Sequence, residues 1–249
     1  MRRTIMVTTW LLAGGCLMVS LNAQERQGDK AGAHTRGSHN RKQRTIPSFS
    51  MSPSPLNDAD STTSKVQRGF DAAPVALNLD GKDIGLVGLG SYLVNIQIGC
   101  NDCHSAGPAT QYAAGGNPFM GQSKMVNPAV YLGGGRDFGA LIPDSAHIVS
   151  RNLTPDNTGL PVGGQTFDEF LEIMRTGADM DHLHPNCAGA PNANCLLRPF
   201  DGNLLQIMPW PGIQGMTDGD IRAIYEYLRA IPCVAGPPAP SPLHNDCTN

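Results

Sequence analysis

Large aromatic side chains are scarce in this 249-residue chain, which contains 7 Phe, 5 Tyr and 2 Trp. The folded part of the chain, roughly 150 residues, is long enough to build one hydrophobic core. Aromatic side chains normally supply much of the volume of such a core. We therefore expect another large apolar body to fill the centre of the domain.

The chain also lacks an apolar run long enough for a stable membrane span, which needs about 20 residues. Its most apolar stretch, Ile5 to Val19, is short and is interrupted by Thr and Gly. With Arg2 and Arg3 before the apolar run and Leu21-Asn22-Ala23 after it, the segment 1–23 is typical of a secretory signal peptide. We predict an exported, periplasmic protein, and lipoprotein anchoring through Cys16 is the alternative.

Residues 24–78 contain few large apolar side chains and are rich in Ser, Gly, Pro, Asn and Gln. Such a composition buries too little surface to offset the ordering entropy of the chain, so it predicts a disordered linker. The folded domain is expected over residues 79–232, followed by a C-terminal tail over residues 233–249.

The charges are distributed unevenly along the chain. Residues 24–49 hold six basic and two acidic residues, whereas residues 50–249 hold ten basic and nineteen acidic residues. A basic tail on an acidic body suits peripheral attachment to an anionic membrane surface or electrostatic steering; the alternative is a solvated spacer. An acidic body repels phosphate, so nucleic-acid binding is not expected.

The most informative motif is Cys100-Asn-Asp-Cys103-His104, since C-x-x-C-H is the attachment pattern of haem c. Each thiol can form a thioether with one vinyl group, and the adjacent imidazole becomes an axial iron ligand. One covalent haem would also explain the low aromatic content. The motif occurs once and the chain shows no internal repeat, which excludes a dihaem peroxidase.

Four further cysteines follow the haem motif, and an exported protein is expected to pair them. Joining Cys187 to Cys195 and Cys233 to Cys247 closes the shortest loops of the three possible pairings, so we predict these two disulfides. The alternatives are free thiols or a second metal site.

Three helices are expected from capping signals and helical spacing. The first covers residues 88–99 and leads into the haem motif, with glycines near its start that would let another helix cross closely. The second begins after the capping box Thr166-Phe-Asp-Glu169 and ends at Gly177. The third begins after Thr217 and ends at Pro232.

The sixth position of the iron decides the function of a haem with one histidine ligand. Met208 precedes Pro209 in an apolar loop, which suits a sulfur held against the iron; the alternative is an ordinary core methionine. The other candidates for this position are Met120, Met125, His147, His182 and His184. His182 and His184, near two aspartates, form a weaker candidate for a surface metal site, with exposed polar loop residues as the alternative.

Taken together, these motifs resemble a class I cytochrome c domain over residues 85–232, similar to the domains in cytochrome subunits of periplasmic alcohol and aldehyde dehydrogenase complexes. The resemblance rests on the helix before C-x-x-C-H, the Gly-rich loops, Asn152-Leu-Thr-Pro-Asp156, the Met-Pro step and the final Thr-Asp-x-Asp helix. It implies an all-α domain with long Gly/Pro-rich loops around one covalently bound haem. It also implies thioethers at Cys100 and Cys103, axial ligation by His104 and Met208, and Arg136 and Asn152 as neighbours of the haem propionates.

The expected function is that of an electron carrier rather than an enzyme. Iron with His/Met ligation cycles between the ferric and ferrous states, and a redox partner protein, a dehydrogenase or an oxidase, supplies or accepts the electron. One alternative is a five-coordinate haem c protein for gas sensing or peroxide chemistry. Another is a thiol oxidoreductase that uses C-x-x-C without haem.

Overall fold

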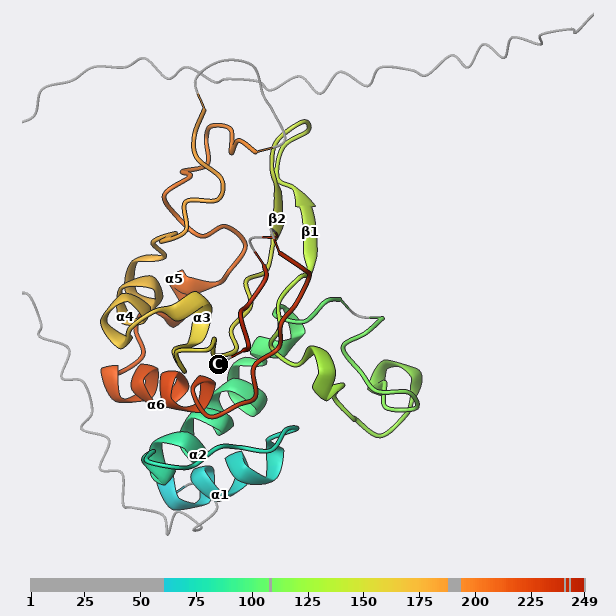
Figure 1. Ribbon diagram of the computed structural model, residues 1–249, viewed down its shortest axis with the longest axis vertical. Coiled ribbons are helices and arrows are strands. Elements are labelled where there is room, and N and C mark those ends of the chain that lie inside the picture. Colours follow the sequence, from blue (N-terminus) through green and yellow to red (C-terminus); the bar gives the residue numbers. More distant parts are fainter. Residues whose placement is uncertain (1–60, 108, 188–193, 240, 242, 249) are drawn as a thin grey trace, which may run out of the picture. The chain divides into compact units, whose positions relative to one another are not determined.

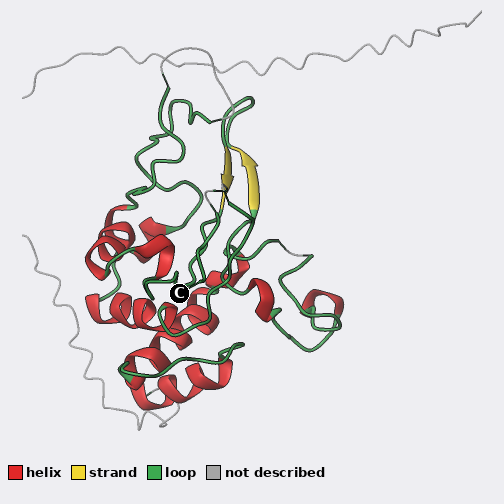
Figure 2. Ribbon diagram, viewed as in Figure 1, coloured by secondary structure: helices red, strands yellow, loops and turns green. Residues whose placement is uncertain are grey.

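The computed structural model describes residues 61–107, 109–187, 194–239, 241 and 243–248, which belong to one compact unit. Helices dominate, and one small sheet accompanies them (Figures 1 and 2). The helices are α1 (Thr62–Ala72), α2 (Ile84–Tyr92), α3 (Pro161–Gly164), α4 (Phe167–Thr176), α5 (Trp210–Ile213) and α6 (Asp218–Leu228); the strands are β1 (Asp137–Ala140) and β2 (His147–Val149). The predicted signal peptide, Cys16 and the basic stretch lie outside the described residues.

Helices α4 and α6 begin at the residues that their capping signals predict. The Thr166 side chain accepts a hydrogen bond from the Glu169 amide, and the Glu169 carboxylate accepts one from the Thr166 amide at 2.8 Å. The α4 helix ends at Gly177, which has a left-handed φ of 73°. The Thr217 side chain caps α6 by accepting a hydrogen bond from the Asp220 amide, but α6 ends at Leu228, before the predicted limit.

Helix α2 leads into the C-x-x-C-H motif. It begins four residues before the predicted start because the Asp83 side chain caps the amide of Leu86. Its last turns widen into a π-helix over Leu93–Ile98, and Gly99, with a φ of 75°, reverses the chain before Cys100. The predicted helix is therefore confirmed, with a different start and a change of helix type.

Two glycines of α2 let α1 and α6 approach its backbone on either side, and the three helices lie together in Figure 1. A Cβ atom at Gly90 would lie 1.9 Å from the carbonyl oxygen of Ala223 in α6. A Cβ atom at Gly69 in α1 would lie 1.9 Å from the carbonyl oxygen of Gly88. The close crossing predicted from the glycines is confirmed, and it brings two further helices into contact with α2.

We expect Gly90→Ala to destabilise the domain by about 3 kcal/mol, because backbone atoms that cannot rotate away occupy the space of the new methyl group. Gly219→Ala is the matched control: Gly219 lies in α6, is exposed, and its added Cβ would meet only the Thr217 hydroxyl, at an ordinary contact distance of 3.7 Å. That control should be neutral or stabilising by up to about 1 kcal/mol. Urea unfolding of both variants measures the difference, and equal stabilities would contradict the close crossing.

The predicted disordered linker is wrong for residues 61–78, which belong to the fold. Ser61 caps α1, and Phe70 of this helix packs on the hydrophobic core together with Val75 and Leu77. The amide of Asn78 donates a hydrogen bond to the carbonyl of Ala230 at 2.8 Å. The prediction failed because residues 61–78 follow a long polar segment and contain only a few apolar side chains of their own. These few side chains pack against the core.

The all-α expectation holds for most of the fold but misses the antiparallel pair β1–β2. This hairpin pairs Asp137 with Val149 and Ala140 with His147. Its strands are three and four residues long, too short to give a strong alternation of apolar and polar residues. No helix within the described ranges is long and apolar enough to cross a membrane.

Both predicted disulfides are confirmed, Cys187–Cys195 and Cys233–Cys247. The second one anchors the C-terminal tail, where the buried side chain of Asn245 donates hydrogen bonds to the carbonyl oxygens of Thr154 and Pro155. The tail therefore packs on the domain rather than extending from it.

Candidate functional site

A large, mainly apolar cavity lies where the C-x-x-C-H motif, the sheet, α4, α6 and the Met208 loop meet. The cavity is partly open to solvent. The apolar wall is formed by Val94, Ile98, Phe138, Ile148, Val149, Leu153, Phe170, Met174, Leu204, Leu205, Ile207, Met208, Pro209, Ile213, Ile224 and Leu228. The cavity is therefore an apolar site in the part of the fold where the sequence analysis expects a large apolar group.

His104 lies on this wall with its ring orientation fixed. Its Nδ1 is 2.8 Å from the backbone carbonyl oxygen of Arg151. Since a carbonyl only accepts, Nδ1 carries the proton and Nε2 keeps a free lone pair for a metal. Burial lowers the pKa of His104 below its usual value, which favours the neutral imidazole that a metal binds.

The two cysteines of the motif are free thiols on the same wall. Cys100 is half-buried and Cys103 is exposed. Burial raises the pKa of Cys100 to about 12, whereas thiols that perform disulfide exchange have a pKa lowered to about 3.5–7.5. The environment of Cys100 thus disfavours thiol oxidoreductase chemistry.

Met208 lies on the wall of the same cavity, half-buried and packed against the core. The loop that carries it is braced by Trp210, whose indole nitrogen donates a hydrogen bond to the Leu205 carbonyl at 3.2 Å. The Trp210 ring lies against Gly177 at the end of α4, where an added Cβ would be 2.2 Å from the ring. The Met208 loop is therefore fixed by the packing of Trp210 against the end of α4, in addition to the restraint from its own prolines.

The structure separates the other candidates for the sixth position into two groups. Met120, Met125, His147 and His182 are not among the residues that line the cavity, and Met120 is 72% exposed. His184 does line it, as does Met174 from the buried face of α4. The sequence did not single out Met174, because its spacing is that of an ordinary core residue.

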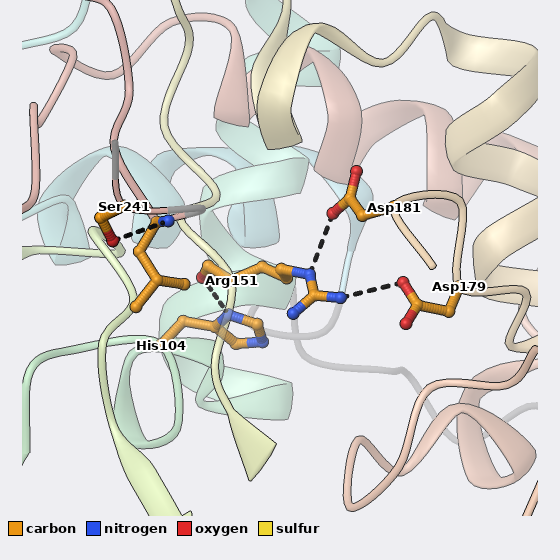
Figure 3. A network of polar contacts seen from close by, with 6 residues as sticks. His104, Arg151, Asp179, Asp181 and Ser241 are labelled. Atoms are coloured by element: carbon orange, nitrogen blue, oxygen red, sulfur yellow. Dashed lines mark hydrogen bonds and ion pairs between the residues drawn. The ribbon is translucent and has the colours of Figure 1, made fainter. Parts of the chain in front are cut away.

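Arg151 connects several parts of the site, as Figure 3 shows. Its carbonyl oxygen faces His104, while its guanidinium pairs with Asp179 at 2.9 Å and with Asp181 at 3.0 Å. Within the described part of the chain, no group of three or more His, Cys, Asp or Glu side chains is placed to hold a metal ion. Asp179 and Asp181 therefore form ion pairs with Arg151. The hypothesis of a surface metal site at His182 and His184 gains no support.

Arg136 and Asn152 do not line the cavity. The Asn152 amide donates to the Val234 carbonyl at 2.7 Å, and its oxygen accepts from the amide and hydroxyl of Thr154. The Arg136 guanidinium binds the Asp102 carbonyl and lies over the Phe138 ring. Both side chains are committed to other partners, so the geometry gives their predicted contact with haem propionates no support.

The donor set and the cavity fit a haem. The fit is seen in the apolar wall, two free thiols, one imidazole with a free Nε2, and thioether sulfur on the same wall.

Comparisons of the chain with family models, with curated proteins and with solved structures find no match.

Proposed function

We propose that the chain is an exported monohaem electron carrier of the class I cytochrome c type. The observation that carries this proposal is the cavity itself, on whose wall the C-x-x-C-H motif and the Met208 loop meet although they are about a hundred residues apart. The thiols, the imidazole and the thioether on this wall each have a distinct proposed role in holding the haem.

Cys100 and Cys103 would hold the haem by thioether bonds, so that it stays with the protein outside the cytoplasm. His104 would bind through Nε2, with the Arg151 carbonyl fixing its ring plane. Met208 would offer its sulfur from the braced loop, and the apolar wall would exclude water. When bound, haem supplies one-electron chemistry between ferric and ferrous iron.

The chemistry needs no general acid or base, and we therefore propose a carrier and not an enzyme. A redox partner protein, a dehydrogenase or an oxidase, would deliver or take the electron. His/Met ligation favours ferrous iron and raises the reduction potential, within the span of roughly 0.8 V that axial ligands cover.

Two measurements on the purified exported protein test this proposal. Mass spectrometry of the denatured chain should show one haem covalently attached. A spectroelectrochemical titration should show a single, reversible one-electron step. A denatured chain without the haem mass, or a protein that consumes peroxide steadily, would contradict the proposal.

A further inference from the structure

The two proposed iron ligands belong to different parts of the cavity wall. His104 is hydrogen-bonded to the carbonyl of Arg151, which follows strand β2. Met208 belongs to the long loop between α4 and α5. The separation between the imidazole and the sulfur thus depends on what fixes these two parts to each other.

The Met208 loop forms one hydrogen-bonded unit with the segment that follows α4. The amide of Asp179 donates to the carbonyl of Asn203 at 2.8 Å. Ala178 and Leu204 form an antiparallel bridge directly beside it. Asp179 is therefore fixed to the backbone of the loop that carries Met208.

The Arg151 side chain joins this unit to the His104 side, as Figure 3 shows. Its ion pair with Asp179 is shielded, because the two side chains are 16% and 6% exposed, whereas Asp181 is 48% exposed. Removing one partner of a shielded pair leaves a charge that the surroundings do not compensate, so such a pair resists separation. With two carboxylates on one guanidinium, Arg151 is also poorly suited to bind a further anion.

We propose that the Arg151–Asp179 ion pair is a clasp that fixes the His104 side of the cavity to the Met208 side. Arg151, Asp179 and Asp181 are then positioning residues that keep the Met208 sulfur at the iron and the sixth position closed. They act through the Arg151 carbonyl and the Asn203 contact and do not touch the iron. This inference rests on the proposed function and adds to it the device that keeps the site closed. Outer partners of this kind fix the orientation of the ligands that they support.

The test is carbon monoxide binding to the dithionite-reduced, exported holoprotein. We expect Asp179→Asn to keep one haem per chain and to bind carbon monoxide at least about tenfold more tightly than the upper limit that the unchanged wild-type spectrum sets, a change of at least about 1.4 kcal/mol. Asp181→Asn, which leaves the shielded pair intact, should give a smaller increase. Asp137→Asn is the matched control, since it breaks the exposed His147–Asp137 pair on the hairpin and should leave carbon monoxide binding unchanged.

The outcomes separate this inference from the proposed function. If the wild type lacks covalent haem, the proposed function fails. If neither the wild type nor Asp179→Asn binds carbon monoxide, and the variant has its full haem content, only the clasp is overturned. If Asp179→Asn accumulates no haem, Asp181→Asn decides: carbon monoxide binding above that of Asp137→Asn supports the clasp, and equal binding overturns it.

Discussion

Replacing Cys100 and Cys103 together by serine should remove all covalently bound haem from the chain. Serine hydroxyls cannot form the thioether bonds that the C-x-x-C-H pattern provides. The cavity wall would remain mainly apolar, but the haem would be lost on denaturation. A haem stain of a denaturing gel measures the effect, and we expect no signal at the mass of the protein.

The matched control removes two cysteines at another place. Cys187→Ser with Cys195→Ser breaks the confirmed disulfide and should keep one haem per chain. It should destabilise the fold by about 2–3 kcal/mol, because a short loop is no longer closed in the unfolded state. A haem stain that survives the Cys100 and Cys103 substitutions would contradict the assignment of the motif.

Met208→Ala should open the sixth position of the iron. Alanine has no atom that can bind iron, so carbon monoxide should bind the reduced variant at once. Loss of the thioether should also lower the reduction potential by on the order of 0.1 V, since axial ligands tune it over roughly 0.8 V. Absorption spectra with and without carbon monoxide and a redox titration measure the two effects.

Met174→Leu is the control for this prediction, because Met174 is the other methionine on the cavity wall. Its side chain is 3% exposed and lies on the core face of α4, so leucine of similar volume should cost less than about 1.5 kcal/mol. The site should stay closed to carbon monoxide in this variant. If reduced Met174→Leu binds carbon monoxide and reduced Met208→Ala does not, Met174 and not Met208 is the sixth iron ligand.

Features that depend on residues close in sequence could be predicted. The capping box of α4 joins Thr166 to Glu169, and its end needs only Gly177. The disulfides join cysteines 8 and 14 residues apart. In each case the partner that satisfies the backbone donor or the thiol lies within the same short segment.

Features that depend on distant contacts could not be predicted. Arg151 is 28 residues from Asp179, and no local spacing marks the two as partners. The resemblance suggests Asn152 as a neighbour of the haem propionates, and no local spacing marks the bond that this side chain makes to Val234, 82 residues away. Helix α1 was missed because its stability comes from Phe70 packing on the core and from the crossing at Gly69, and not from local hydrophobicity.

The first experiment to make is the visible spectrum of the reduced, exported wild-type protein, recorded before and after adding carbon monoxide. We expect a sharp, low-spin haem c spectrum that carbon monoxide does not change, because His104 and Met208 would occupy both axial positions. A spectrum that shifts on addition of the gas would contradict the closed site and would favour gas sensing or peroxide chemistry instead.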